Sequence, residues 1–505
     1  MDGGQQGTRL LPLSDRRDGR RRPREHRVLP CAGNPGGRGS CPGPLRPGGG
    51  GRVDPGHDLH DGRLLVVVDK YGDQQRLAVV DLRDPLAPRL DGPLVPLSDT
   101  RVATTRFIGH VGDTLYLHTS RDAPNYRVVA VEFGDPTRWR TVLPESEHLL
   151  QHARVVGGRL VAVHLRDVRN ELATYALDGT DRRVVPLPAP GSAVYLSGDP
   201  DDPTLTFAFD AYAYPLTTFR HDVRTGEVEA LGSQSFEHDP GHYRTRQVFF
   251  PSKDGTRIPM FVVHRADIVP NGRRPTLLYG YGAVGGVESP IFRDEFFAWI
   301  AAGGVLAVAN VRGGGEYGEA WRQAGILDRK QNSFDDFIAA AEALIREGYT
   351  SPDHLAALGE SNGGMLVGAA MTQRPDLFAA VLPVVGVLDA LRFPSFTAGP
   401  RWAISHGDPA DPEAFKWLET WSPLHRIEDG VCYPATLLTT AVNDDLVHPS
   451  QSYKFAARLQ HAQACDRPTV LRAYATGAHY IIFELETQAD VLAFAARHTG
   501  LDVPN

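Results

Sequence analysis

The sequence predicts two folded regions, an all-β region in the first half of the chain and an α/β domain with a doubly wound, mostly parallel sheet in the second. Strand-like segments recur at intervals of 45–50 residues before residue 240, which predicts the all-β region. After residue 240, short apolar strands end in loops that carry polar residues, as in an α/β sheet. One of these strands runs into a glycine-flanked serine and then a helical stretch, which places a candidate nucleophile in the second region.

The repeated strands of the first region begin near Gly62, Gly112, Gly157 and Asp202. A second strand follows the first two of them about a dozen residues later, at residues 76–81 and 126–131. Periods of about 40–50 residues are typical of propeller blades, each of which is a small antiparallel sheet. We therefore interpret residues 61–240 as a partial β-propeller of about four blades. A plain β-sandwich with coincidental spacing is the alternative.

The candidate nucleophile, Ser361, lies in the sequence Gly-Glu-Ser-Asn-Gly-Gly, directly after the apolar residues 355–358. A sharp turn from strand to helix crowds the backbone at the serine, so only small neighbours at Gly359 and Gly363 leave its hydroxyl exposed. A G-x-S-x-G pattern alone is weak evidence in a chain with 52 glycines. Its position between a strand and a helix, however, indicates a nucleophile elbow.

A serine nucleophile needs a base and an acid, which in α/β-hydrolases follow it in the order Ser, Asp or Glu, His, each after a later strand. Residues 435–440 read as a buried strand that runs into Asp444, the candidate acid, with Asp445 as the alternative. Residues 469–474 read as the next strand, and the loop after it carries His479, the candidate general base. Each residue alone could have a structural role, but the ordered set at strand ends predicts a catalytic triad.

Several stretches of the second region match a known family. They include FFPSKDGT at 249–256, LYGYG at 278–282, GGVLAVANVRGGGEYG at 303–318, and shorter segments at 334–337, 347–352 and 373–378. Through these stretches, residues from about 240 to 500 resemble the catalytic domain of the prolyl oligopeptidase family, whose members are serine peptidases that cut short peptides after proline. The resemblance implies that Ser361, Asp444 and His479 are nucleophile, acid and base, in agreement with their order in the chain.

The resemblance also implies an oxyanion site and a proline pocket. The oxyanion would be held by the Tyr281 hydroxyl and the backbone N–H of Asn362; a packed aromatic ring is the alternative for Tyr281. Trp402 would stack on the substrate proline, and Val387 and Val447 would form apolar walls. A flat apolar slot suits proline because the pyrrolidine ring has no hydrogen-bond donor and gains mainly from burial and stacking. Without the resemblance, the tryptophan and the two valines would be interpreted as core residues.

Four positions depart from the family pattern. His406 replaces a tyrosine of the pocket and Val284 replaces a phenylalanine, so we expect a pocket that accepts proline but binds it less firmly. Leu446 stands where the family has an arginine that binds a substrate carbonyl, which removes a charge-assisted hydrogen bond worth about 1.5–3 kcal/mol. Tyr480 follows the proposed base where the family has glycine, so we expect the position of the His479 ring to be affected.

Residues 1–60 contain 11 arginines, no lysine, 14 glycines and 8 prolines. Such a composition cannot bury enough apolar surface to offset the entropy of ordering, so we predict that this segment is disordered. The family carries a seven-bladed propeller preceded by a segment that packs on the catalytic domain, and neither fits in the remaining residues. We therefore expect an N-terminally incomplete family member, in which residues 1–60 replace the authentic start and an open propeller favours poor folding.

The composition of the 505 residues, 42% of them hydrophobic, predicts at least two domains. A net charge of −8 disfavours nucleic-acid binding by the folded part. No run approaches the ~18 apolar residues of a membrane span, and the N-terminus lacks the apolar core of a signal peptide, so we expect no membrane association and a cytoplasmic location. The four cysteines, Cys31, Cys41, Cys432 and Cys465, have no metal-ligand spacing and indicate no disulfide framework. No metal or cofactor is implied, and we expect a monomer.

The sequence thus predicts a serine peptidase that hydrolyses short proline-containing peptides on the carboxyl side of proline through an acyl-enzyme, with residues 241–505 as the peptidase domain. One alternative is a broader α/β-hydrolase that acts on esters or other peptides. Another is an inactive fragment that acts only as a binding module.

Overall fold

The computed structural model describes residues 52–55, 63–71, 74–84, 87, 92–98, 103–233 and 239–502. The segment 1–60, for which we predict disorder, lies outside these residues except for Arg52–Pro55. Those residues form strand β1, which pairs antiparallel with β2 (Leu64–Tyr71). Main-chain groups of this short stretch thus take part in a sheet, and the disorder of residues 1–60 stays a prediction.

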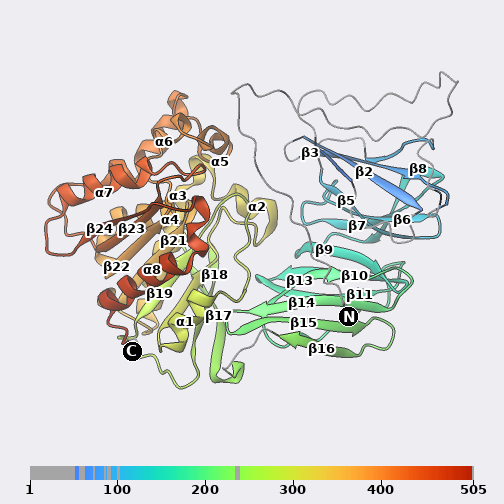
Figure 1. The fold of residues 1–505 in the computed structure, drawn as a ribbon, viewed down its shortest axis with the longest axis horizontal. Helices are drawn as coiled ribbons and strands as arrows, with labels where there is room; N and C mark the ends of the chain where they lie inside the picture. The colour runs from blue at the N-terminus through green and yellow to red at the C-terminus, as the bar shows by residue number, and fades with distance from the viewer. Residues whose placement is uncertain are drawn as a thin grey trace, which may run out of the picture. The chain divides into compact units, whose positions relative to one another are not determined.

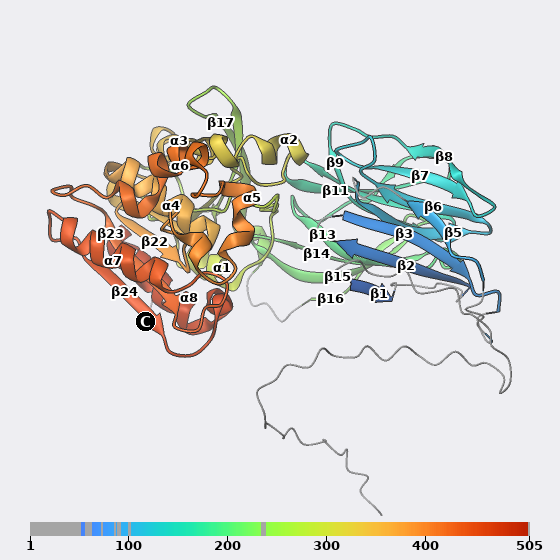
Figure 2. The ribbon, with the colours of Figure 1, turned by 90° about the horizontal axis from the view of Figure 1, so that it is seen from above.

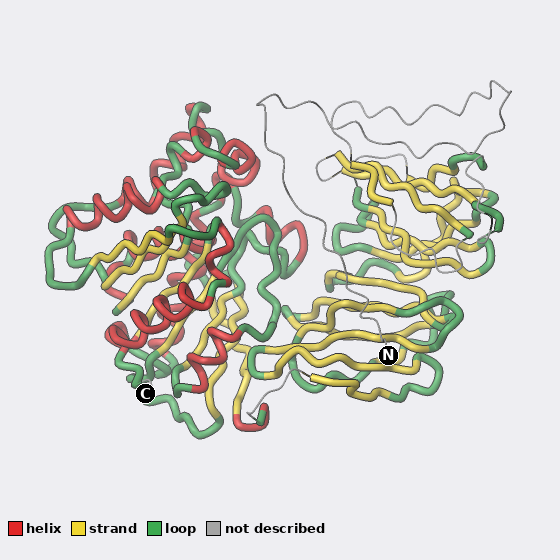
Figure 3. The backbone as a smooth tube through the Cα atoms, in the orientation of Figure 1, coloured by secondary structure: helices red, strands yellow, loops and turns green. Residues whose placement is uncertain are grey.

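In the part of the all-β region that the structure describes, four antiparallel sheets have four strands each, shown in Figure 3 as yellow strands. The first contains β1, β2, β3 (Gln74–Asp81) and β4 (Val95–Ser98). The second contains β5 (Thr105–Val111), β6 (Thr114–Thr119), β7 (Arg127–Glu132) and β8 (Asp135–Leu143). The third contains β9 (Leu149–Val156), β10 (Arg159–Arg166), β11 (Arg169–Tyr175) and β12 (Arg183–Val184). The fourth contains β13 (Ser192–Ser197), β14 (Thr204–Ala211), β15 (Tyr214–Asp222) and β16 (Val228–Ser233).

Alternating side chains of the inner strands pack each sheet against its neighbours. On β6, Leu115 and Leu117 join an apolar cluster with the first sheet, whereas Tyr116 joins a cluster with the third. On β10, Val161 and Val163 belong to a cluster that contains residues of the fourth sheet. Successive small antiparallel sheets that bury both faces in this way are the blades of a propeller. The predicted fold class is confirmed, while the boundaries at residues 61 and 240 stay predictions.

The α/β domain is built on one eight-stranded sheet with the order β17-β18-β20-β19-β21-β22-β23-β24. Strand β18 is antiparallel to both β17 and β20, and all other pairs are parallel. The strands are β17 (Tyr243–Pro251), β18 (Arg257–Arg265), β19 (Thr276–Gly280), β20 (Val305–Ala309), β21 (Leu355–Glu360), β22 (Ala380–Val384), β23 (Ala435–Ala441) and β24 (Thr469–Tyr474). The carboxyl ends of the parallel strands meet at one edge, where α/β proteins build their sites.

Helices cover both faces of this sheet, which Figure 1 and Figure 2 show from two directions. The helices are α1 (Asp294–Ala301), α2 (Gly318–Gln323), α3 (Gln331–Arg346), α4 (Asn362–Gln373), α5 (Ala403–His406), α6 (Pro412–Trp421), α7 (Ser450–Ala462) and α8 (Leu485–Thr499). Side chains of α3, α4 and α7 share one core cluster with one face of the sheet. Side chains of α1 and α8 share a second cluster with the other face. Two such layers on a mostly parallel sheet are the doubly wound arrangement that the sequence predicts.

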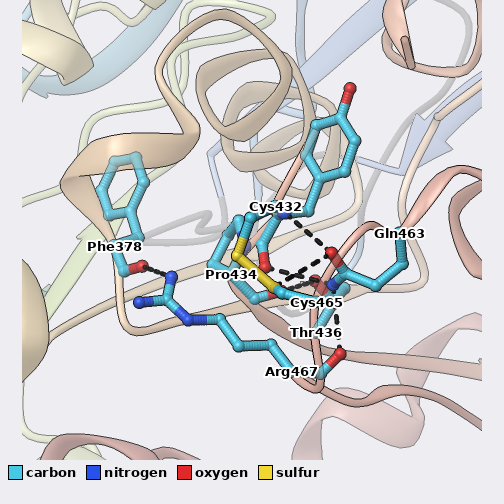
Figure 4. Close-up of a disulfide and its surroundings, with 8 residues drawn as sticks. Phe378, Cys432, Pro434, Thr436, Gln463, Cys465 and Arg467 are labelled. Carbon is cyan, nitrogen blue, oxygen red and sulfur yellow. Dashed lines mark hydrogen bonds between the residues drawn. A yellow bond between two sulfur atoms is a disulfide. The ribbon is translucent and has the colours of Figure 1, made fainter. Parts of the chain in front are cut away.

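A disulfide bond joins Cys432 and Cys465, whose Cα atoms lie 5.2 Å apart (Figure 4). The expectation that the cysteines form no disulfide framework is therefore wrong for this pair. The two residues are 33 positions apart in the sequence, and only folding brings the segment before β23 beside the segment before β24. The Gln463 side chain ties the same segments together, accepting from Tyr433 N at 2.9 Å and donating to Arg467 O at 3.1 Å.

Candidate active site

Ser361 lies in the turn between β21 and α4, with φ 56° and ψ −111°. A non-glycine residue with positive φ is uncommon, and such strain at a sharp turn from strand to helix is characteristic of a nucleophile elbow. A Cβ on Gly359 would lie 2.0 Å from Gly363 O, and a Cβ on Gly363 would lie 2.6 Å from Gly280 O. Side chains at these two positions would collide with the backbone, so the turn requires both glycines, as the sequence predicts.

Asp444 and His479 meet after the two strands at the sheet edge. Asp444 follows β23 and His479 follows β24, and their side chains are 3% and 5% exposed as residues. Asp444 Oδ2 lies 2.9 Å from His479 Nδ1. Because a carboxylate only accepts, Nδ1 carries the hydrogen and Nε2 is left as the basic nitrogen. Among the described residues, Asp445 is exposed and makes no hydrogen bond or ion pair with the histidine, so the geometry favours Asp444 as the acid.

One cavity of about 800 Å³ is lined by both Ser361 and His479. Tyr281, one of the predicted oxyanion residues, also lines it, and burial raises the pKa of the Tyr281 phenol. The hydroxyl therefore stays neutral and able to donate near pH 7. The Asn362 side chain donates to Tyr281 O at 2.7 Å, which ties the loop after β19 to the first residue of α4. The two residues that carry the predicted oxyanion donors are thus hydrogen-bonded to each other, and Asn362 directly follows the serine.

Two of the predicted pocket residues surround the buried ring of Phe393. Its centroid lies 5.9 Å from the ring of Trp402 and 5.9 Å from that of His406. Trp402 is half-buried, whereas His406 is buried, and burial lowers the pKa of the His406 imidazole to about 3. His406 is therefore neutral at physiological pH and takes part in an aromatic cluster.

The two predicted pocket valines contact the triad through their backbones. Val387 N donates to Ser361 O at 3.2 Å, and Val447 N donates to Asp444 Oδ1 at 2.8 Å. Both side chains are buried in the core cluster. Trp402, His406 and these valines are not among the described residues that line the cavity of Ser361, so they stay predictions as substrate contacts.

The positions that depart from the family pattern have different surroundings. Leu446 and Tyr480 line the cavity, and Tyr480 is 64% exposed. Val284 is 63% exposed with φ 47° and is not among the residues that line it. Leu446 and Tyr480 are therefore the departures that alter the surface beside the serine.

Sequence reasoning missed a group of charged residues in the same cavity. Arg293 Nη2 donates to Glu360 Oε1 at 2.6 Å, and Arg293 also pairs with Glu295. The Tyr279 hydroxyl donates to Glu360 Oε2 at 3.3 Å. Glu360 directly precedes Ser361 in the elbow motif, so the sequence does indicate a carboxylate beside the serine. The other members come from elsewhere in the chain, Tyr279 from β19 and Arg293 with Glu295 from the start of α1, and have no local sequence signal.

Comparison with known proteins decides the family. The model of the prolyl oligopeptidase family matches residues 290–502, and the model of the prolyl oligopeptidase N-terminal β-propeller domain matches residues 60–234. The chain belongs to the prolyl oligopeptidase family. The two matches fall on the α/β domain and on the four small sheets, and they agree with the resemblance noted in the sequence.

Several relatives in the family are similar over most of this chain. A prolyl endopeptidase of Elizabethkingia meningoseptica is 39% identical over 397 residues, which are 77% of this chain and 56% of that protein. A solved prolyl endopeptidase structure is 41% identical with a TM-score of 0.75, covering 88% of this chain and 64% of that one. Prolyl oligopeptidase B of Galerina marginata in its apo form is 29% identical with a TM-score of 0.76, with the same coverage. The chain spans little more than half the length of the curated relatives it matches.

Proposed function

We propose that the chain is a serine peptidase that hydrolyses short peptides on the carboxyl side of proline. The observation that carries this proposal is the arrangement of Ser361, His479 and Asp444. The serine and the histidine line one cavity. Asp444 Oδ2 lies 2.9 Å from His479 Nδ1, which leaves Nε2 as the basic nitrogen. Relatives that carry the name prolyl endopeptidase support the substrate class.

The proposed mechanism is acyl transfer. Ser361 Oγ attacks the carbonyl carbon of the proline residue while His479 Nε2 takes the hydroxyl proton. The carbonyl oxygen becomes an oxyanion, which the Tyr281 hydroxyl and the Asn362 backbone N–H stabilise. The C–N bond then breaks, and His479 gives the proton to the leaving amine. Water attacks the resulting ester with His479 again as base, which releases the acid product and restores the serine.

Asp444 has two roles in this proposal. Its Oδ2 fixes the histidine tautomer and stabilises the imidazolium that forms during the reaction. Its Oδ1 accepts from Leu446 N at 2.9 Å and Val447 N at 2.8 Å, which holds the carboxylate in place. No step requires a metal or a cofactor.

For proline selection we propose Trp402 as the stacking ring, with Val387, Val447 and His406 around it. The aromatic cluster centred on Phe393 supports an apolar pocket of this kind, because proline gains from contact with ring faces. The neutral state of His406 is consistent with an uncharged pocket.

A chromogenic Gly-Pro amide tests the proposal. The parent chain should release the chromophore, and Ser361→Ala should lower kcat by about 10⁵–10⁶-fold. Equal turnover by Ser361→Ala and the parent would refute the assignment of the nucleophile. Turnover of esters without turnover of the proline amide would favour the broader hydrolase, and absence of labelling by a fluorophosphonate would favour an inactive binding module.

The proposed partners are short proline-containing peptides, and the proposed state is a cytoplasmic monomer. Across the described ranges, no helix is both long and apolar enough to cross a membrane. Because disulfides persist mainly in oxidising compartments, a cytoplasmic location predicts that the Cys432–Cys465 pair is reduced in the cell. Cell fractionation together with thiol labelling of the native protein tests the location.

A further inference from the structure

The cavity beside Ser361 carries far more acidic than basic groups. Among the described residues, its lining includes one guanidinium, that of Arg293, and five carboxylates, those of Asp210, Glu288, Asp294, Glu295 and Glu360. Its volume of about 800 Å³ falls within the range of sites that bind small ligands. An excess of negative charge beside a nucleophile bears on which substrates can enter.

Arg293 balances only part of this charge. Its guanidinium pairs with both Glu295 and Glu360 and lies over the ring of Phe296 at 4.3 Å. Asp210 and Glu288 have no ion pair with a basic side chain in the ranges that the structure covers. These two carboxylates are therefore available to a cation from outside the chain.

Asp210 shows most clearly that a partner is needed. It comes from the end of β14, is 8% exposed, and lines the cavity. Its Oδ2 accepts from Phe292 N at 3.3 Å, but its Oδ1 has no hydrogen-bond partner among the described residues. A buried carboxylate oxygen without a donor is unfavourable, and a cationic donor at this position would remove that penalty.

The pKa directions agree with this geometry. Burial raises the pKa of Asp210 to about 6 and that of Glu288 to about 7, although Arg293 acts in the opposite direction on Glu288. Both shifts arise because the ionised form is desolvated without a sufficient positive charge beside it.

Two further features suit an organic cation. Leu446 lines the cavity where the family pattern has an arginine, so the site lacks that positive charge. The rings of Tyr480 and Phe483 also line it and are stacked with centroids 6.2 Å apart. Aromatic faces attract ammonium and guanidinium groups and contact the apolar stems of basic side chains. No group of three or more His, Cys, Asp or Glu side chains in the described residues is placed to hold a metal ion.

We propose that this cavity is a subsite for a cationic group of the peptide substrate, bound by Asp210 and Glu288. The group is an ammonium or guanidinium, supplied either by the peptide's amino terminus or by a lysine or arginine side chain. The inference rests on the proposed peptidase function and adds a substrate class to it, namely basic proline-containing peptides.

Matched peptide pairs test the proposal on the full chain. One set carries lysine or its uncharged analogue norleucine at each of three positions on either side of proline, and a second set has a free or an acetylated amino terminus. At low ionic strength we expect the charged member of at least one pair to have a kcat/KM about tenfold to a hundredfold higher. A gain with lysine identifies a side-chain cation, and a gain with the free terminus identifies the α-ammonium group.

Asp210→Asn and Glu288→Gln should each reduce this charge preference, and added NaCl should reduce it in the parent. Glu347→Gln is the matched control, because Glu347 is an exposed carboxylate that does not line the cavity. The proposal is overturned if no charged peptide is preferred by more than twofold. It is also overturned if both cavity variants keep the same preference as the parent and Glu347→Gln.

A binding measurement separates this inference from the peptidase proposal. Fluorescence anisotropy on Ser361→Ala needs no turnover, and it uses both labelled sets, lysine against norleucine and free against acetylated amino terminus. Tighter binding of the charged member in either set supports the subsite even if the parent cleaves no proline amide, a result that would refute only the peptidase function. Equal binding within both sets, together with turnover of proline amides, would refute only the subsite.

Discussion

Substitution of Asp444 by asparagine should remove most of the activity while leaving the shape of the site intact. The reason lies in the different partners of the two carboxylate oxygens. Oδ1 accepts from the backbone N–H groups of Leu446 and Val447 at 2.9 and 2.8 Å, and Oδ2 lies 2.9 Å from His479 Nδ1. Asp444 is buried, so bulk water cannot take the place of the hydrogen-bond partners of either oxygen.

An asparagine amide has one oxygen and one NH₂ group to place at these two positions. With NH₂ at the Oδ1 position, two backbone donors would face a donor, at a cost of about 1–3 kcal/mol for each unsatisfied group. The amide oxygen therefore stays at that position, and NH₂ faces His479 Nδ1. The imidazole must then accept at Nδ1 and carry its hydrogen on Nε2, which is the wrong tautomer for a base. Loss of the correct tautomer lowers kcat by about 10⁴-fold, or about 5.5 kcal/mol of barrier.

Steady-state hydrolysis of a Gly-Pro amide measures this effect, and thermal melting checks that Asp444→Asn is folded. A kcat within tenfold of the parent would refute the tautomer argument. Asp445→Asn is the companion variant, because the sequence alone leaves Asp445 as the alternative acid. Its side chain is exposed, so we expect a kcat close to that of the parent.

Three further outcomes follow from the site and its supports. Tyr281→Phe should lower kcat by about 10²–10³-fold with little change in KM, because one oxyanion donor is removed; a kcat within threefold of the parent in steady-state assays would exclude that role. The double variant Cys432→Ala with Cys465→Ala should lower the free energy of unfolding by about 2–4 kcal/mol, as measured by denaturant titration of protein whose disulfide is verified by thiol counting; unchanged stability would contradict the expectation. Leu446→Arg should bring the ratio of kcat/KM for lysine over norleucine peptides towards one, and an unchanged ratio would show that position 446 does not affect the field in the cavity.

The arrangement of the proposed triad could be predicted because each member follows a strand of the same parallel sheet. The strands before Ser361 and Asp444 are visible as short buried apolar runs, and the structure places them as β21 and β23. The strand before His479 is β24 at the edge of the sheet, where only Tyr474 is buried. Parallel strands deliver their following loops to one edge, so chain order and strand pattern suffice to predict that Ser361 and His479 line one cavity and that Asp444 pairs with the histidine. The requirement for glycine at position 359 is equally local, because a Cβ there would meet Gly363, whereas the requirement at Gly363 also depends on Gly280 of β19.

The features that escaped prediction depend on contacts between distant segments. The pairing of Cys432 with Cys465 requires the order of β23 and β24 in the sheet, which four scattered cysteines do not reveal. The position of Asp210 requires a strand of the all-β region to meet the loop that carries Phe292, a contact between residues 82 positions apart. Periodicity and motifs report local structure, and neither encodes such contacts.

Leu446 illustrates how a family site can change its charge without changing its proposed chemistry. The backbone N–H of this residue holds Asp444, whereas its side chain lines the cavity beside Ser361. Any residue except proline can supply that N–H, so the side chain is free to vary while the acid stays in place. An arginine at this position would offset the field of Asp210 and Glu288, and a leucine leaves it uncompensated. The charge of the cavity is therefore set independently of the pair formed by Asp444 and His479, and substrate preference can diverge on an unaltered set of proposed catalytic groups.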